Sequence, residues 1–108
     1  MMQETELTLA DQKNASIIKG IEAINSASSF LCDLDGPNDA DFAYAKNLII
    51  RWIALISEQC LFLQNIVPSD DFAFWDAVDR INGHSLRCEQ HIVFMKQNFH
   101  LSKDGEAL

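Results

Sequence analysis

Apolar residues recur at three- and four-residue steps through most of this chain, which is the spacing of α-helices. The pattern is densest in residues 48–67, where fourteen of the twenty residues are apolar. One stripe in this region consists of Leu48, Ile49, Trp52, Leu55, Ile56, Leu63 and Ile66, and a second, on the opposite flank, of Ala43, Ile50, Ala54 and Leu61. A helix that is apolar on two sides is buried on two sides. We therefore expect a central helix, with a second copy of the protein as one candidate for its cover.

Capping residues and turn formers mark where the predicted helices begin and end. Thr8 is a favourable helix start, and a first helix is expected over about residues 9–32. Its apolar stripe consists of Ala10, Ile17, Ile21, Ile24, Ser28 and Leu31. A run rich in Asp, Gly and Pro ends this helix. Either Asp39 or Asp41 can cap a second helix, which is expected over about residues 40–66.

The third predicted helix begins after Pro68, with Ser69 as its expected N-cap. Its apolar positions alternate in steps of four and three, as in the seam of a helical bundle or coiled coil. These positions are Phe74, Val78, Ile81, Ser85, Cys88, Ile92, Met95 and Phe99. Glycine costs about 1 kcal/mol relative to alanine inside a helix. The sequence therefore leaves open whether this helix runs unbroken through Gly83 or is kinked or broken there.

Three long helices joined by short loops pack most simply as an antiparallel, up-down-up bundle. The predicted fold is all-α, with residues 1–108 forming a single helical domain and with flexible ends at residues 1–7 and 102–108. A length of 108 residues corresponds to one domain, and an apolar fraction of 48 % suits a globular core.

The charge balance argues against several function classes. Sixteen acidic residues against eight basic ones give a net charge of −8, and no window holds a cluster of Lys and Arg. Such a chain has no electrostatic reason to approach phosphate backbones or anionic lipid. Direct nucleic-acid binding is therefore not expected, and a protein partner with a basic surface fits better. Residues 48–67 are long enough to span a membrane, but their two charged and three amide side chains favour a soluble core and no membrane association.

The N-terminus lacks the basic and apolar regions of a signal peptide, so the protein is expected to be cytoplasmic. Its three cysteines are Cys32, Cys60 and Cys88. With a rise of about 1.5 Å per residue, their expected heights along the bundle differ too much for the roughly 7 Å that bridged Cα atoms require. Three free thiols and a reducing compartment are therefore expected.

One face of the third helix carries ligands that zinc and copper accept. His84, Cys88, His91 and Met95 follow one another at steps of four, three and four. A zinc site needs three or four ligands that converge from more than one segment. The facing parts of the other helices supply no inward Cys, His, Asp or Glu. Core and border positions are the favoured interpretation, no cofactor is expected, and a soft-metal or thiol-based sensor using His84, Cys88 and His91 is the alternative.

Residues 30–36, Phe-Leu-Cys-Asp-Leu-Asp-Gly, are similar to the nucleophile motif of haloacid-dehalogenase-type phosphatases. The resemblance implies a nucleophilic first Asp and an acid/base second Asp at the end of a β-strand in a parallel sheet. Residues 17–31 have helical period instead, Pro37 replaces the usual Thr, and no strand is predicted downstream. No catalytic residue is assigned, and the protein is not expected to be an enzyme.

Association is the function that the sequence favours. In a lone three-helix bundle, the second stripes of the second and third helices would lie partly in water, and monomers rarely expose such patches without a use. The predicted interaction surface consists of Ile50, Ala54, Leu61, Trp75, Leu86 and Val93. We expect a regulator, inhibitor or adaptor that docks a helical apolar face on a protein partner, with a homodimer as the expected assembly. The alternative is a monomer whose third helix turns back at Gly83 and covers the stripe.

Overall fold

The computed structural model describes residues 8–37 and 39–99. They form three α-helices, α1 (Leu9–Cys32), α2 (Ala40–Gln64) and α3 (Phe72–Asn98), and this described part contains no strand. The all-α, three-helix prediction is confirmed. The termini that the sequence predicts to be flexible lie outside the described residues.

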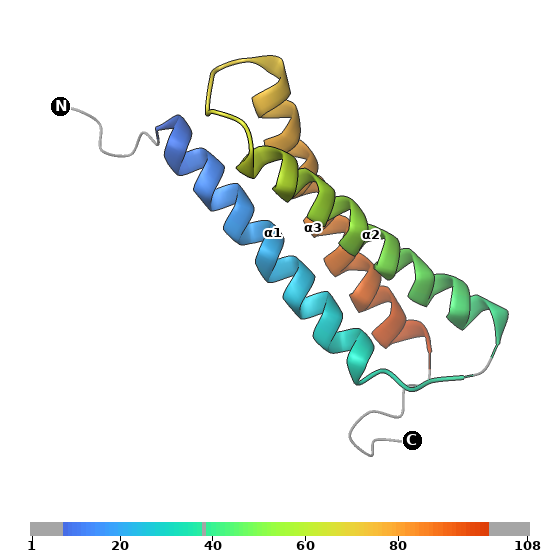
Figure 1. Ribbon diagram of the computed structural model, residues 1–108. Helices are drawn as coiled ribbons and strands as arrows, with labels where there is room; N and C mark the ends of the chain where they lie inside the picture. Colours follow the sequence, from blue (N-terminus) through green and yellow to red (C-terminus); the bar gives the residue numbers. More distant parts are fainter. Residues whose placement is uncertain (1–7, 38, 100–108) are drawn as a thin grey trace.

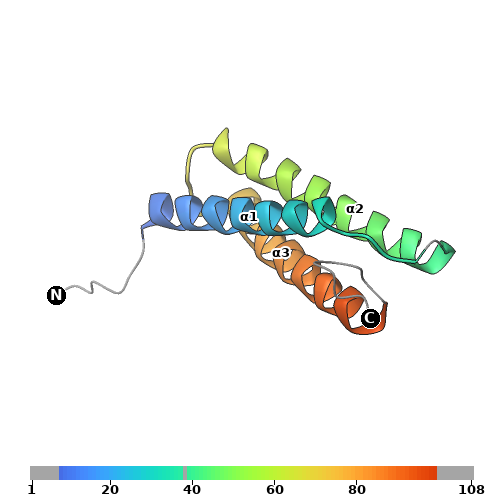
Figure 2. The same ribbon diagram turned by 90° about the horizontal axis from the view of Figure 1, so that it is seen from below.

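The three helices pack side by side along most of their length. Figure 1 shows that α2 runs back alongside α1 and that α3 then returns in the direction of α1. Each helix contacts both of the others. In the view of Figure 2, α3 crosses α1 at an angle. The resulting body is elongated, with extents of 56 × 26 × 17 Å.

The first two helices begin at the residues that their sequences indicate. Thr8 and Asp11 form a reciprocal capping box, in which the Asp11 N–H donates to Thr8 Oγ1 at 3.0 Å. Asp39 caps α2, because its carboxylate accepts a 2.8 Å hydrogen bond from the N–H of Phe42. Of the two candidate caps, Asp39 is therefore the one used, and Asp41 lies in the first turn.

The N-cap of α3 is Asp71, so the prediction of Ser69 is wrong. Asp71 Oδ1 accepts a hydrogen bond from the N–H of Phe74 at 3.0 Å, and Oδ2 accepts one from the Ser69 hydroxyl at 2.8 Å. These two bonds, the backbone one first, hold the pKa of Asp71 below its usual value. A carboxylate is the better cap because it is the stronger acceptor and its charge favours the N-terminal end of the helix dipole.

Hydrogen bonds from Lys13 connect the beginning of α1 to the end of α2. α2 ends at Gln64, slightly before the predicted end, and Asn65 is its C-cap. The Lys13 ammonium donates to the carbonyl oxygens of Gln64 at 3.3 Å and of Ile66 at 2.8 Å. The last carbonyls of a helix have no partner within the helix, so a cation at this position stabilises the end of α2.

α3 runs unbroken through Gly83, so a third helix that turns back there to cover the apolar stripe is not formed. A Cβ atom on Gly83 would meet only the Arg87 side chain, at 3.5 Å, which is ordinary contact. The predicted seam lies in the core on both sides of this glycine, because Phe74, Ile81 and Met95 are fully buried. Burial of the seam holds the helix continuous across the glycine.

α1 meets its neighbours through small side chains. Its buried residues are Ser16, Ile17, Gly20 and Ala27. Ile21, which the apolar stripe placed inside, is 44 % exposed, so that prediction is wrong. A Cβ atom on Gly20 would lie 2.5 Å from Cys60 Sγ and 3.2 Å from side-chain atoms of Ile56 and Ile81. Gly20 thus marks the point where all three helices meet.

Gly20→Ala and Gly83→Ala form a matched pair that tests this close approach. Replacing a helical glycine by alanine in open space stabilises a protein by about 0.5–1 kcal/mol, and we expect that gain at Gly83. At Gly20 the added methyl group overlaps Cys60, and overpacking of this kind costs about 1–3 kcal/mol. We therefore expect Gly20→Ala to lower the free energy of unfolding, measured by urea denaturation. Equal stabilisation by both substitutions would contradict the close approach of α1.

Candidate interaction surfaces

The three helices form three outward faces, one for each pair of neighbours. The α1–α2 face carries Ile18, Ile21, Ile50, Ala54, Ser57 and Leu61. The α1–α3 face contains a groove. By helical spacing, the α2–α3 face carries Asp41, Tyr44, Leu48, Arg51, Leu55 and Phe62 of α2, with Glu58 at its edge, and Asp76, Arg80, His84, Arg87, His91 and Phe94 of α3. The side chains that reach each face follow from the contacts of each helix and from its rotation of about 100° per residue.

Ile50, Ala54 and Leu61, three of the predicted surface residues, are exposed on the α1 side of α2. Ile50 is 47 % and Leu61 is 61 % exposed. The opposite side of α2 is marked by Trp52, whose ring stacks on His84 of α3 with 5.4 Å between centroids. The three residues project about 160–200° away from Trp52. They therefore lie beside α1, as one stripe.

Two isoleucines of α1 extend this stripe, and the sequence did not identify them as surface residues. Ile18 is 55 % and Ile21 is 44 % exposed. Both project about 140–160° away from Ala23, which lines the groove with α3. Gly20 lies close to Cys60 and Ile56, so Ile18 and Ile21 lie beside the same part of α2. The small residues that alternate with these isoleucines along α1 were the sequence signal that could have indicated the exposure of both isoleucines.

The centre of the α1–α2 face is uncharged. Between Ile50 and Leu61, this side of α2 carries only Ala54 and Ser57, and Glu58 lies at the edge. Four half-exposed aliphatic side chains present on the order of 300–400 Å² of apolar surface. A patch of that size is comparable to the largest apolar patch of a typical monomer, which is often functional.

The predicted surface residues of α3 lie elsewhere. Leu86 is 52 % exposed and lines the groove between α1 and α3, and Val93, on the same side of α3, is 47 % exposed. Trp75 is half-buried against the core, and its indole N–H donates to Asp70 at 2.7 Å. The structure therefore divides the six predicted residues between two sides of the bundle.

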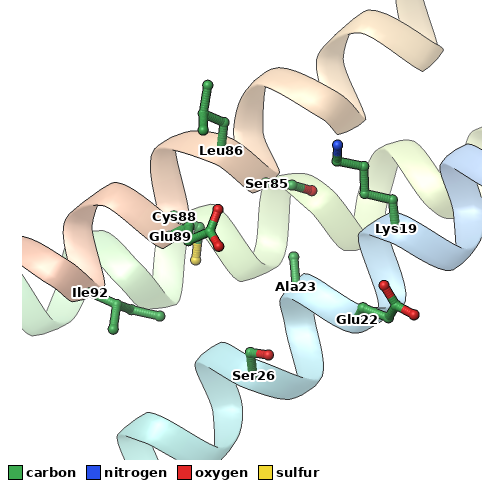
Figure 3. A pocket seen from close by; sticks show the side chains of 9 residues that line it. All are labelled: Lys19, Glu22, Ala23, Ser26, Ser85, Leu86, Cys88, Glu89 and Ile92. Atoms are coloured by element: carbon green, nitrogen blue, oxygen red, sulfur yellow. The ribbon is translucent and has the colours of Figure 1, made fainter.

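The α1–α3 groove has a volume of about 370 Å³. It exists because Ala23 and Ser26 of α1 face Ser85 of α3, and these side chains are too small to fill the space (Figure 3). Cys88 lies at its base and is 1 % exposed; burial first, and then the charge of Glu89, raise the pKa of this thiol. A protonated thiol is a weak nucleophile, so the groove does not activate Cys88.

The α2–α3 face combines aromatic and charged side chains. Burial first, and then the charges of Arg87 and Arg80, lower the pKa of His84. Arg80 also forms a 2.7 Å ion pair with Asp76, one turn before it on α3. In the described part of the chain, His84 Nδ1 and Trp52 Nε1 are buried without hydrogen-bond partners. The two rings, tilted by 38°, pack α2 against α3, and their unpartnered nitrogens reduce the gain from this contact.

The residues of the alternative metal sensor contact different helices. Cys88 lines the groove with α1, whereas His84 stacks on Trp52 of α2. Over residues 8–37 and 39–99, no group of three or more His, Cys, Asp or Glu is placed to hold a metal ion. The phosphatase-like motif falls on the end of α1 and the loop after it, where Asp33 is the C-cap.

Comparison of the chain with protein families, curated proteins and solved structures gives no match. None of the described helices is both long enough and apolar enough to cross a membrane.

The lowered pKa of His84 predicts a loss of stability in mildly acidic solution. In the unfolded chain this histidine takes up a proton near pH 6.5, whereas the folded chain resists protonation to a lower pH. As the pH falls through 6.5, the unfolded state binds the proton first, so the free energy of unfolding decreases until the pKa of the folded state is reached. We expect His84→Gln to flatten this dependence between pH 7 and about pH 5.5 in urea denaturation. A slope unchanged by the substitution would show that His84 is not its source.

Proposed function

We propose that this protein acts by non-enzymatic association, and that a second copy of the chain covers the α1–α2 face. The observation that carries the proposal is the exposure of four aliphatic side chains on one uncharged face: Ile18, Ile21, Ile50 and Leu61. Burying such a face releases it from water, which is the main source of stability in protein association.

The apolar area is sufficient for a symmetric pair. Two copies of the patch amount to about 600–800 Å² of apolar surface, which at about 25 cal/mol per Å² gives roughly 15–20 kcal/mol of gross stabilisation. Association costs about 4–15 kcal/mol in lost freedom. Asn14, Asn25 and Gln64 are exposed polar residues at helical positions beside the patch, and they supply a polar rim of the kind that interfaces have.

The uncharged centre of the α1–α2 face allows a second copy to bind in spite of the net charge. Each chain has a net charge of −8, so two copies repel one another when charged surfaces meet. The centre of the α1–α2 face has no charged side chain, and a twofold axis there places apolar residues against apolar residues. This face therefore allows two acidic molecules to approach without bringing like charges into contact.

We propose that such a dimer acts as a regulator, an inhibitor or an adaptor of another protein. The groove offers no activated nucleophile, and Cys32, Cys60 and Cys88 are all free. Free thiols suit a reducing compartment, which supports a cytoplasmic location.

Leu61→Glu and Ile50→Glu test the proposed interface. Each places a carboxylate in the centre of the pair, so we expect the dimer to dissociate to monomers in size-exclusion chromatography with light scattering. Helicity by circular dichroism should stay close to that of the wild type, because both side chains are already half-exposed. Leu86→Glu is the matched control, since Leu86 is 52 % exposed on another face and its substitution should leave the dimer intact.

Three results would contradict the interface: a wild-type monomer at all concentrations, equal disruption by Leu86→Glu, or unfolding of the Leu61→Glu variant. Unfolding would mean that Leu61 belongs to the core of a single copy.

A further inference from the structure

The α1–α3 groove lies where both helices carry small side chains. Ile81 is fully buried in the seam of α3, whereas the next two positions of this seam carry Ser85 and Cys88. Ala23 and Ser26 lie across the groove on α1 (Figure 3). The side chains leave a space of about 370 Å³ between the helices. Unfilled space in a seam loses van der Waals contact, so packing alone gives no reason for small residues on both sides.

Ser85 brings an unpartnered hydroxyl to the lining of this groove. Ser85 is 5 % exposed, and among the described residues its Oγ atom is buried without a hydrogen-bond partner. In Figure 3 the Ser85 side chain extends from α3 toward the side on which Lys19 of α1 lies. A buried hydroxyl without a partner destabilises the fold. Because a serine hydroxyl turns between staggered rotamers, it can meet a polar group that enters the groove and so regain a hydrogen bond.

The base of the groove is neutral. Burial raises the pKa of the Cys88 thiol, which therefore stays protonated near neutral pH, and Ser85 carries no charge. Lys19, Glu22 and Glu89 are the charged residues that line the groove, and all three are exposed. Charges of both signs therefore remain in water at the rim. A ligand that carried a charge into the base would lose its hydration without gaining a counter-ion there.

The rest of the lining is apolar, and the volume of the groove limits the size of a ligand. Ala23 of α1 and Leu86 and Ile92 of α3 provide the apolar contact. Sites for small molecules have volumes of about 300 Å³ and more, so the groove lies at the small end of this range. Since a water molecule occupies about 30 Å³ in the liquid, a ligand that fits has on the order of ten non-hydrogen atoms or fewer.

We propose that the α1–α3 groove binds a small neutral ligand, with its aliphatic or aromatic body between the two helices and its hydroxyl or carbonyl group hydrogen-bonded to Ser85. Such a ligand fills the space that the small side chains leave and satisfies the buried hydroxyl at the same time. An anion or a cation of the same shape fits less well, because the base of the groove offers it no opposite charge. The proposal does not depend on the α1–α2 dimer, since the groove lies on another side of α1.

Cyclohexanol is the probe that tests the proposal, because it combines an aliphatic ring of suitable size with one hydroxyl. We expect its titration into the isotope-labelled full chain to shift the amide NMR signals of Ala23, Ser26 and Ser85, with a Kd on the order of millimolar for so small a ligand. Ser85→Ala should raise that Kd about two- to tenfold, as the loss of one hydrogen bond does. Cyclohexanecarboxylate and cyclohexylammonium should each bind several-fold more weakly than cyclohexanol.

Ala23→Leu fills the groove and should abolish the shifts, and Ser26→Leu does the same from an exposed position if the first variant fails to fold by circular dichroism. Ala54→Leu is the matched control, because the same enlargement on the α1–α2 face should leave the Kd unchanged. A lack of shifts up to the solubility of cyclohexanol, equal binding by the filled variant, equal binding by Ser85→Ala, or equal binding of either charged probe would each overturn the proposal. Binding retained by the Leu61→Glu variant would support it and separate it from the proposed dimer.

Discussion

The close approach of α1 to α2 and α3 at Gly20 is the constraint on which the rest of the molecule depends. Only a residue without a side chain fits there, since a Cβ atom would lie 2.5 Å from Cys60 Sγ. Ser16 and Ala27 continue the close contact before and after Gly20, and Ile17 and Ile24 pack beside them. As a consequence, Ile18 and Ile21 remain at the surface, where they extend the apolar stripe of α2.

Much of the fold could be predicted from the sequence, because most positions of the predicted stripes of α2 and α3 are buried or half-buried. Leu55, which the prediction placed in the α2 stripe, is an exception, since it is 38 % exposed. The orientation of α1 could be predicted only in part. Ile17, Ile24 and Leu31 of the predicted stripe pack in or against the core, but Ala10, Ile21 and Ser28 are exposed. Their places in the core are taken by Ser16, Gly20 and Ala27. What places Ile21 outside is the space left by Cys60 and Ile56, which belong to a distant part of the chain. The sequence analysis took Ser69 as the cap of α3, whereas Asp71 caps it and accepts a hydrogen bond from the Ser69 hydroxyl, which is visible only in the structure.

The surfaces, like the core, depend partly on the local sequence pattern and partly on the arrangement of the three helices. The exposure of Ile50, Leu61, Leu86 and Val93 follows from helical period alone, but their division between two sides depends on how the three helices are placed. The distribution of charge shows this as well. The net charge of −8 belongs to the whole chain, whereas the side of α2 between Ile50 and Leu61 carries no charged side chain except Glu58 at its edge.

The most direct test of this account is an intermolecular distance measured across the α1–α2 face. The substitution Ser57→Cys, combined with Cys32→Ser, allows a spin label to be attached at position 57, between Ala54 and Leu61, while Cys60 and Cys88 are too buried to react. Because helices that pack together lie about 8–10 Å apart, we expect pulsed electron paramagnetic resonance to show a distance below about 30 Å between two labels. The absence of dipolar coupling in a sample that sediments as a dimer would contradict the account.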